Sequence, residues 1–147
     1  MISHAVTVNY VVGDSMLLRP LFLGRVQAGY PTPADDEVDY DLDLNRHIFK
    51  SPETTMMVSM LGDGFKDDGV YDGDLLVADT SLRPREGNLV VVRIGTEQLI
   101  KKVTRRGGAL YLVDGTGPSE MIELKDAADV KVLAVVTFTI HTIPDRR

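Results

Sequence analysis

Apolar runs separated by glycine-rich or charged turns fill the chain from Thr54 onward. Their lengths and residue types predict six strands, at 56–60, 74–79, 88–95, 98–104, 109–113 and 130–143. The last strand is strongly β-branched across 134–140, and Gly95-Thr96-Glu97 has the composition of a tight hairpin connection. Because successive strands lie close in sequence, we expect a mainly β fold built on one coiled antiparallel sheet.

The first third of the chain has a different pattern. Residues 6–12 could form a strand, whereas 17–37 contain three prolines and few regular repeats, which indicates an extended arm. One short helix is predicted at 42–49, with Asp43 as its N-cap and Ser51-Pro52 as its stop. The predicted organisation is therefore an N-terminal arm, residues 1–37, followed by a single domain, residues 38–147.

Composition limits the possible functions. The chain has 147 residues, of which 44% are apolar and 26% charged, as expected for one globular domain. The formal net charge of -6 argues against direct binding of the DNA phosphate backbone. Acidic residues gather at 35–41, which indicates either a solvated linker or an acidic docking strip.

Several classes of site are disfavoured by the residues present. There is no cysteine, so disulfides, thiol catalysis and thiolate metal sites are excluded, and His4, His47 and His141 lack the spacing of metal ligands. The run 68–79 superficially resembles a calcium loop, but Val70 occupies a required ligand position. We expect no cofactor and no metal. No apolar run has membrane-spanning length and no secretion signal is visible, so the expected location is cytoplasmic.

One lysine has an unusual predicted neighbourhood. Side chains alternate along the strand 98–104, so Lys101 shares a face with Leu99 and Val103. If that face is buried, loss of water disfavours the ammonium form, and a neutral amine can act as a general base. The alternative from the pattern alone is a lysine that extends to the surface from a half-exposed strand.

The segment 61–74, Leu-Gly-Asp-Gly-Phe-Lys-Asp-Asp-Gly-Val-Tyr-Asp-Gly-Asp, resembles the active-site turn of the LexA/UmuD self-cleaving peptidases. In that family the turn reads roughly Gly-Asp-Ser-Met, then a glycine, then Asp-Gly-Asp and an apolar strand. Here Gly64 stands where the nucleophilic serine is expected, and Phe65 stands where methionine is expected. The resemblance extends from about Leu18 to the C-terminus, and it implies the coiled β fold of the LexA C-terminal domain and UmuD.

Two further segments carry the resemblance. Ile100-Lys101-Lys102-Val103 is similar to the family's lysine strand, which places Lys101 at the general-base position. Residues 24–34 look like the cleavage segment of the UmuD branch, where the bond precedes a glycine, and this maps onto Ala28-Gly29. Small residues there let a backbone approach an active site closely. From the residues alone, an ordinary flexible arm is the alternative.

The glycine at position 64 changes the chemistry that the resemblance implies. A Ser-Lys mechanism needs a hydroxyl, so no acyl-enzyme can form at Gly64. Backbone amides of the turn could still bind a carbonyl oxygen, and we expect Lys101 to find a carboxylate, a carbonyl or water as its partner. Ser15, in a displaced Gly-Asp-Ser-Met tetrapeptide, and Ser59, in the strand before the turn, are weaker candidates for a substitute nucleophile.

The resemblance therefore implies a UmuD-like protein of the SOS DNA-damage response that binds partners without cleaving itself. The chain has no room for a DNA-binding domain before its arm, unlike LexA. Implied partners are a second copy, the RecA filament, a Y-family translesion DNA polymerase and an active relative in a mixed dimer. Strands 89–94 and 132–140 offer candidate dimer surfaces, including edge pairing. The alternative is a self-cleaving peptidase lineage in a nucleophile-disabled form; the departure at Phe65 as well favours a natural change.

Overall fold

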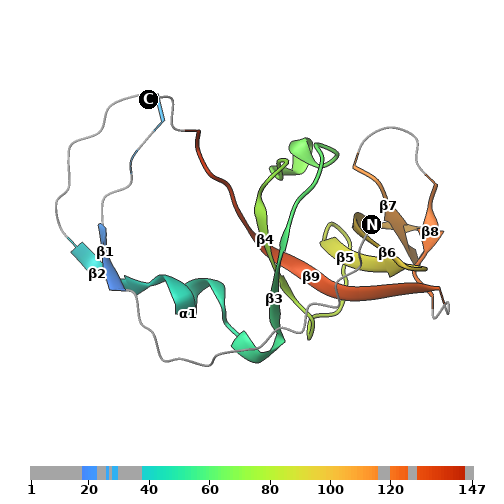
Figure 1. Cartoon of the computed structure of the whole chain (residues 1–147), viewed down its shortest axis with the longest axis horizontal. Helices are drawn as coiled ribbons and strands as arrows, with labels where there is room; N and C mark the ends of the chain where they lie inside the picture. Colours follow the sequence, from blue (N-terminus) through green and yellow to red (C-terminus); the bar gives the residue numbers. More distant parts are fainter. Residues whose placement is uncertain are drawn as a thin grey trace. The chain divides into compact units, whose positions relative to one another are not determined.

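The computed structural model describes residues 18–22, 26, 28–29, 38–115, 120–125 and 129–144 (Figure 1). The predicted strand at 6–12, Ser15 and His4 lie outside these residues. The chain divides into two compact units, residues 10–52 and residues 53–147 with 1–9, and each is described by itself. The sequence predicts a boundary between residues 37 and 38, with an arm before it and a domain after it. The division into two units does not test this boundary, which stays a prediction.

The smaller unit contains a two-stranded antiparallel sheet, β1 (Leu18–Phe22) and β2 (Val38–Asp43), and the helix α1 (Leu44–Ile48). Two features of this unit are not predicted: residues 18–22 of the expected arm pair as a strand, and the second half of the acidic run, for which the sequence suggests a solvated linker or an acidic docking strip, belongs to β2. The missed signal is an alternation, because Val38, Tyr40 and Leu42 are separated by single aspartates. Alternation of period two is typical of a strand.

The short helix confirms one prediction about local chemistry. It lies within the predicted span 42–49, and the Asp43 side chain accepts a hydrogen bond from the Asn45 N–H at 3.1 Å. This satisfies one of the amide groups that the first turn of a helix leaves without a partner. Leu42 and Asp43, which were assigned to the helix, instead end β2.

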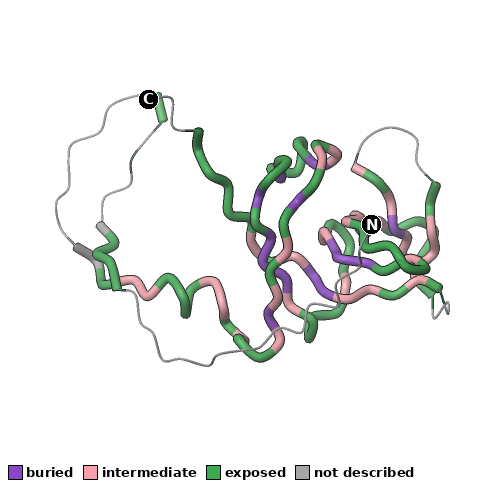
Figure 2. The backbone as a smooth tube through the Cα atoms, viewed as in Figure 1, coloured by how far each residue is buried: buried purple, intermediate pink, exposed green. Residues whose placement is uncertain are grey.

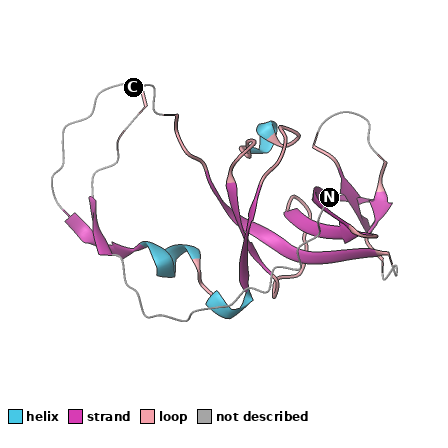
Figure 3. Ribbon diagram, viewed as in Figure 1, coloured by secondary structure: helices cyan, strands magenta, loops and turns pink. Residues whose placement is uncertain are grey.

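The larger unit is a seven-stranded sheet in the order β3-β4-β9-β5-β6-β7-β8, and every neighbouring pair is antiparallel. Figure 3 draws its strands in magenta. The strands are β3 (Thr55–Ser59), β4 (Leu75–Asp79), β5 (Leu89–Ile94), β6 (Glu97–Arg106), β7 (Ala109–Val113), β8 (Ile122–Glu123) and β9 (Val130–Ile140). All six predicted strands are present, and a two-residue turn joins β5 to β6 as expected. The mainly β, antiparallel fold is confirmed.

Three short elements were not predicted: β8 and the 3₁₀ helices η1 (Pro52–Thr54) and η2 (Lys66–Asp68). The expectation of edge pairing is wrong for β5, which pairs with β9 on one side and with β6 on the other. It stays a prediction for β9, which pairs with β5 only through residues 130–135 and with β4 only through residues 135–140. In the described part of this sheet the edge strands are β3 and β8.

The long strand β9 joins two halves of the sheet. Its residues from 130 to 135 pair with β5, and its residues from 135 to 140 pair with β4. The register shifts once in each half, which leaves Leu133 and Thr137 without a direct partner across the ladder. Such bulges bend a strand and increase its twist, which accounts for the coiled sheet that Figure 1 shows around β9.

Buried residues, purple in Figure 2, lie along the inner strands of the sheet. One cluster gathers residues of β5, β6, β7 and β9: Val90, Val92, Val103, Leu112 and Val135. A second brings the turn between β3 and β4 onto the sheet: Met60, Phe65, Val70 and Leu76, with Ile100 packed against them. Strand β6 thus contributes to a core on each of its faces, through Val103 on one side and Ile100 on the other.

Candidate functional site

The turn between β3 and β4 is closed by its own backbone and by the Asp72 carboxylate. Met60 and the segment Gly73-Asp74 exchange two backbone hydrogen bonds of 2.8 Å at its base. Nearer the tip, the Asp72 carboxylate accepts a hydrogen bond from the Gly62 N–H at 2.7 Å. The turn is therefore fixed at its base and braced along its length, which gives position 64 a defined place.

Gly64 has a backbone that any residue can adopt. It is absent from the glycines with positive φ, and a Cβ built on it meets no atom of the described residues within 4 Å. The next residue, Phe65, is only 4% exposed and packs with Met60, Val70 and Leu76. The buried Phe65 side chain thus anchors the turn next to position 64, whereas the space for a Cβ at position 64 itself is open.

The Lys101 side chain is 13% exposed, and its Nζ forms an ion pair with Asp114 Oδ1. This confirms the expectation that a carboxylate, a carbonyl or water would engage the amine. The face that Lys101 shares with Leu99 and Val103 is buried in part, because Val103 is 1% exposed and Leu99 is 37% exposed.

The residue after Asp114 contacts the turn. A Cβ built on Gly115 would overlap the carbonyl oxygen of Gly64 and lie 2.6 Å from Phe65 Cδ1. The loop that follows β7 therefore packs its backbone directly against the backbone at position 64. Through two consecutive residues, this loop contacts both the Lys101 amine and the turn.

A second ion pair ties the same strand to the same turn. Lys102 Nζ lies 2.6 Å from Asp68 Oδ1, and the two side chains are 36% and 24% exposed. Asp68 belongs to η2, which begins two residues after Gly64. Neighbouring lysines on β6 thus pair with two aspartates from different segments.

Asp74 is a buried carboxylate at the base of the turn, with its side chain 1% exposed. It accepts hydrogen bonds from the Tyr71 N–H at 2.9 Å and the Thr139 hydroxyl at 3.0 Å, and its Oδ1 lies 2.5 Å from His141 Nδ1. Burial by itself raises the pKa of Asp74, but these hydrogen bonds outweigh it and hold the pKa below its ordinary value. The carboxylate fastens the turn to the end of β9.

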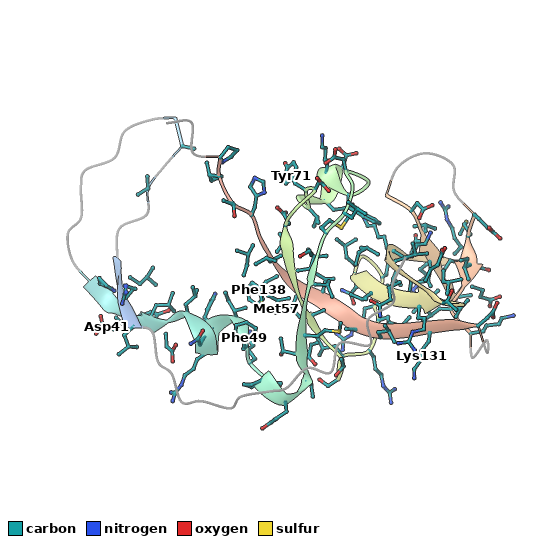
Figure 4. The ribbon with its side chains drawn as sticks, viewed as in Figure 1. Asp41, Phe49, Met57, Tyr71, Lys131 and Phe138 are labelled. Atoms are coloured by element: carbon teal, nitrogen blue, oxygen red, sulfur yellow. The ribbon has the colours of Figure 1, made fainter. Side chains whose placement is uncertain are left out.

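The ring of Tyr71 lies against that of His141, with centroids 4.9 Å apart. Figure 4 shows Tyr71 at the turn. The sequence predicted no role for His141, and its partner Asp74 was noted only as part of the Asp-Gly-Asp motif. His47 lies on α1 and is exposed.

The other predicted residues have no described contact with this turn. Ala28 and Gly29 belong to the smaller unit and are exposed, and their role as a cleavage bond stays a prediction. Ser59 is exposed at the end of β3. Among the described residues, no group of three acidic or histidine side chains could hold a metal ion. Nor is any helix of the described part both long enough and apolar enough to cross a bilayer.

Asp114 and Asp68 are not predicted as site residues, although the sequence carries a signal for Asp114. Gly107-Gly108 is a glycine pair typical of a two-residue hairpin, and it sets the register of β6 against β7. Lys102 pairs with Val113, so one further step brings Asp114 opposite Lys101. No comparable local pattern links Asp68 to Lys102, which lies 34 positions later.

Comparison with known proteins agrees with this geometry. The Peptidase S24-like family profile matches residues 20–137. The chain is 32% identical over 135 residues to protein ImpA of Escherichia coli, which covers 92% of each chain. It is 32% identical over 123 residues to protein SamA of Salmonella typhimurium, covering 83% of this chain and 84% of that protein.

A longer relative matches in part. LexA repressor 1 of Pseudomonas putida is 35% identical over 91 residues, which is 62% of this chain and 45% of the repressor. The family profile, the two relatives of similar length and the coiled antiparallel sheet lead to the same assignment. The chain belongs to the Peptidase S24-like family.

Proposed function

We propose that this protein is a non-cleaving member of its family, a pseudopeptidase that acts as a binding module in the SOS DNA-damage response. The observation that carries the proposal is Gly64, a residue without a side chain at the position where the resemblance to LexA and UmuD places the nucleophile. With no hydroxyl there, the route to an acyl-enzyme is closed.

Lys101 supports this proposal as the general-base position. Its amine engages Asp114, so the group that would activate a nucleophile contacts a carboxylate instead. The turn and β6 nevertheless keep the contacts that hold them together, through Phe65 in the core and the Lys102–Asp68 pair. A fold retained without its nucleophile fits a protein that functions by binding.

The partners follow from the resemblance. We propose a homodimer in the cytoplasm that engages the RecA filament and a Y-family translesion polymerase, and that forms mixed dimers with an active relative. The net charge of -6 disfavours direct binding to DNA. Because β5 is paired on both sides, dimer contacts would use sheet faces, loops, the edge strands β3 and β8, or the parts of β9 that pair on one side only.

One observation favours a second candidate, a self-cleaving lineage member in a nucleophile-disabled form. A Cβ at position 64 meets no atom of the described residues within 4 Å and the φ of Gly64 is ordinary, so the backbone there accepts a residue with a side chain. Under this alternative Ala28-Gly29 remains a cleavable bond, and the substitution at position 64 is the single block.

The test is incubation of the full chain with activated RecA, and separately at alkaline pH, which favours a neutral lysine amine. Mass spectrometry then searches for a fragment that begins at Gly29. We expect no such fragment from the wild-type chain. Its appearance at the rate of an active family member would disprove the non-cleaving function. Binding to the RecA filament is measured on the same uncleaved sample.

A further inference from the structure

We propose that Asp114 is a positioning residue that holds the Lys101 amine in an ion pair and keeps it from serving a hydroxyl at position 64. The inference rests on the proposed function, because it concerns the same lysine and the same turn. It adds a second block to the site: restoring a serine at position 64 would not by itself restore efficient cleavage.

The pair is built into a hairpin. Gly107 and Gly108 connect β6 to β7 with φ angles of 55° and 84°, which suits a two-residue turn of the tight hairpin type. The ladder runs from Arg106 opposite Ala109 to Lys102 opposite Val113. Its next step places Asp114 across from Lys101, at a separation that lets side chains on adjacent strands interact. The backbone therefore sets this contact.

Burial gives the amine few other partners. The Lys101 side chain is 13% exposed, whereas that of Asp114 is 49% exposed. An amine with little access to water loses a hydrogen bond that solvent cannot fully replace when it leaves its carboxylate. The ion pair is thus held more firmly than a pair between two fully exposed side chains.

The loop that carries Asp114 is held against the turn. The backbone of Gly115 lies so close to Gly64 and Phe65 that a Cβ would lie 2.8 Å from the Gly64 carbonyl carbon. A loop packed in this way cannot move its carboxylate far without losing that contact. The ion pair of Asp114 and the packing of Gly115 against the turn therefore both hold this loop in place.

The chemistry explains why the contact blocks cleavage. In the acyl-transfer step, the proton of an introduced serine hydroxyl passes to the neutral amine while the oxygen bonds to the scissile carbonyl carbon. The C–N bond then breaks, the leaving amine takes that proton, and water hydrolyses the resulting ester. An ammonium that donates to Asp114 has no lone pair with which to accept the proton, so the hydroxyl must compete with the carboxylate.

Lysine reactivity tests the ion pair without any cleavage. The folded full-length chain is treated with formaldehyde and cyanoborohydride, and peptide mapping compares methylation of Lys101 with that of Lys131, which is exposed on β9 (Figure 4). We expect Asp114→Asn to speed Lys101 methylation about fivefold or more, as for loss of an ion pair. Asp114→Glu, which keeps the charge, is expected to restore the slow rate.

A matched control comes from the neighbouring lysine. Asp68→Asn removes the partner of Lys102 on the same strand, so it should speed methylation of Lys102 and leave Lys101 unchanged. Equal Lys101 rates in the wild type and Asp114→Asn would overturn the proposal. A rise at Lys101 of the same size in Asp68→Asn would also overturn it, because the effect would then be a general loosening of the strand.

Cleavage gives the second readout. With activated RecA, Gly64→Ser is expected to release the fragment beginning at Gly29 slowly. Gly64→Ser combined with Asp114→Asn is expected to release it faster. Equal rates of fragment release from the single and the double variant would show that Asp114 does not hinder cleavage, which contradicts the proposal. A Gly29 fragment from the wild type would defeat the proposed function, whereas unchanged methylation in Asp114→Asn would defeat only the block, so the two failures are distinguishable.

Discussion

Gly115 lies against the carbonyl of Gly64, and the contact leaves no room for a side chain on Gly115 but ample room for one on Gly64. The two glycines therefore have opposite requirements although they touch. At Gly115 the absent Cβ permits a close approach between two loops, and at Gly64 the absent side chain leaves a space.

The first prediction compares these two glycines. Gly115→Ala should reduce the free energy of unfolding by about 1–3 kcal/mol, because the new methyl group must displace a backbone carbonyl. Gly64→Ala should change it by less than about 0.5 kcal/mol, since its Cβ meets nothing. Urea unfolding followed by circular dichroism measures both. Equal losses in the two variants would show that the loops do not approach as described.

The second prediction concerns the anchor of the turn. Phe65 is 4% exposed, so Phe65→Ala should cost about 3–5 kcal/mol through lost burial and the cavity left behind. Phe65→Met, which introduces the residue that the LexA/UmuD pattern carries there, should cost less than about 1.5 kcal/mol because volume is largely conserved. Thermal unfolding of both variants checks that Phe65→Ala loses more stability than Phe65→Met. A Phe65→Ala variant as stable as the wild type would mean that this ring does not hold the turn.

Much of the sheet could be predicted because its signals are local. Strand β7 was placed with the observed bounds, and Asp43 was identified as an N-cap, since both depend on neighbouring residues. The two strands of the smaller unit were missed because prolines and aspartates outweighed the alternation of Val38, Tyr40 and Leu42 in the interpretation. Pro20 is tolerated in β1 because a two-stranded sheet consists of edges only.

The candidate site was less accessible from the sequence. Lys101 was found through strand alternation and resemblance, yet its partner Asp114 needed the register of the β6–β7 hairpin. The contact of Gly115 with Gly64 depends on how a loop packs on a turn about fifty residues earlier, and no periodicity encodes such packing. Ion pairs such as Lys102–Asp68 are invisible for the same reason.

The third prediction concerns the strength of that second ion pair. Both side chains are partly exposed, so the coupling energy between Lys102 and Asp68 should be small, about 0.2–1 kcal/mol. A double-mutant cycle with Lys102→Met and Asp68→Asn, measured by urea unfolding in low and high salt, gives this value. The coupling should shrink as salt rises. A coupling of several kcal/mol would indicate that the pair is far less hydrated than its exposure implies.

The fourth prediction is a dependence of stability on acid, caused by Asp74. Hydrogen bonds hold its folded-state pKa below the ordinary value, so the carboxylate adds stability above the unfolded pKa, near pH 4, and loses it as pH falls through the folded pKa. Asp74→Asn should unfold at lower urea concentration at pH 7 and show a shallower decline below pH 4. Thr139→Val keeps the charge of Asp74 but removes one hydrogen bond to it. Its urea midpoint at pH 7 should therefore lie between those of the wild type and Asp74→Asn. Urea midpoints measured from pH 2.5 to 7 would contradict this account if the wild-type and Asp74→Asn curves ran parallel.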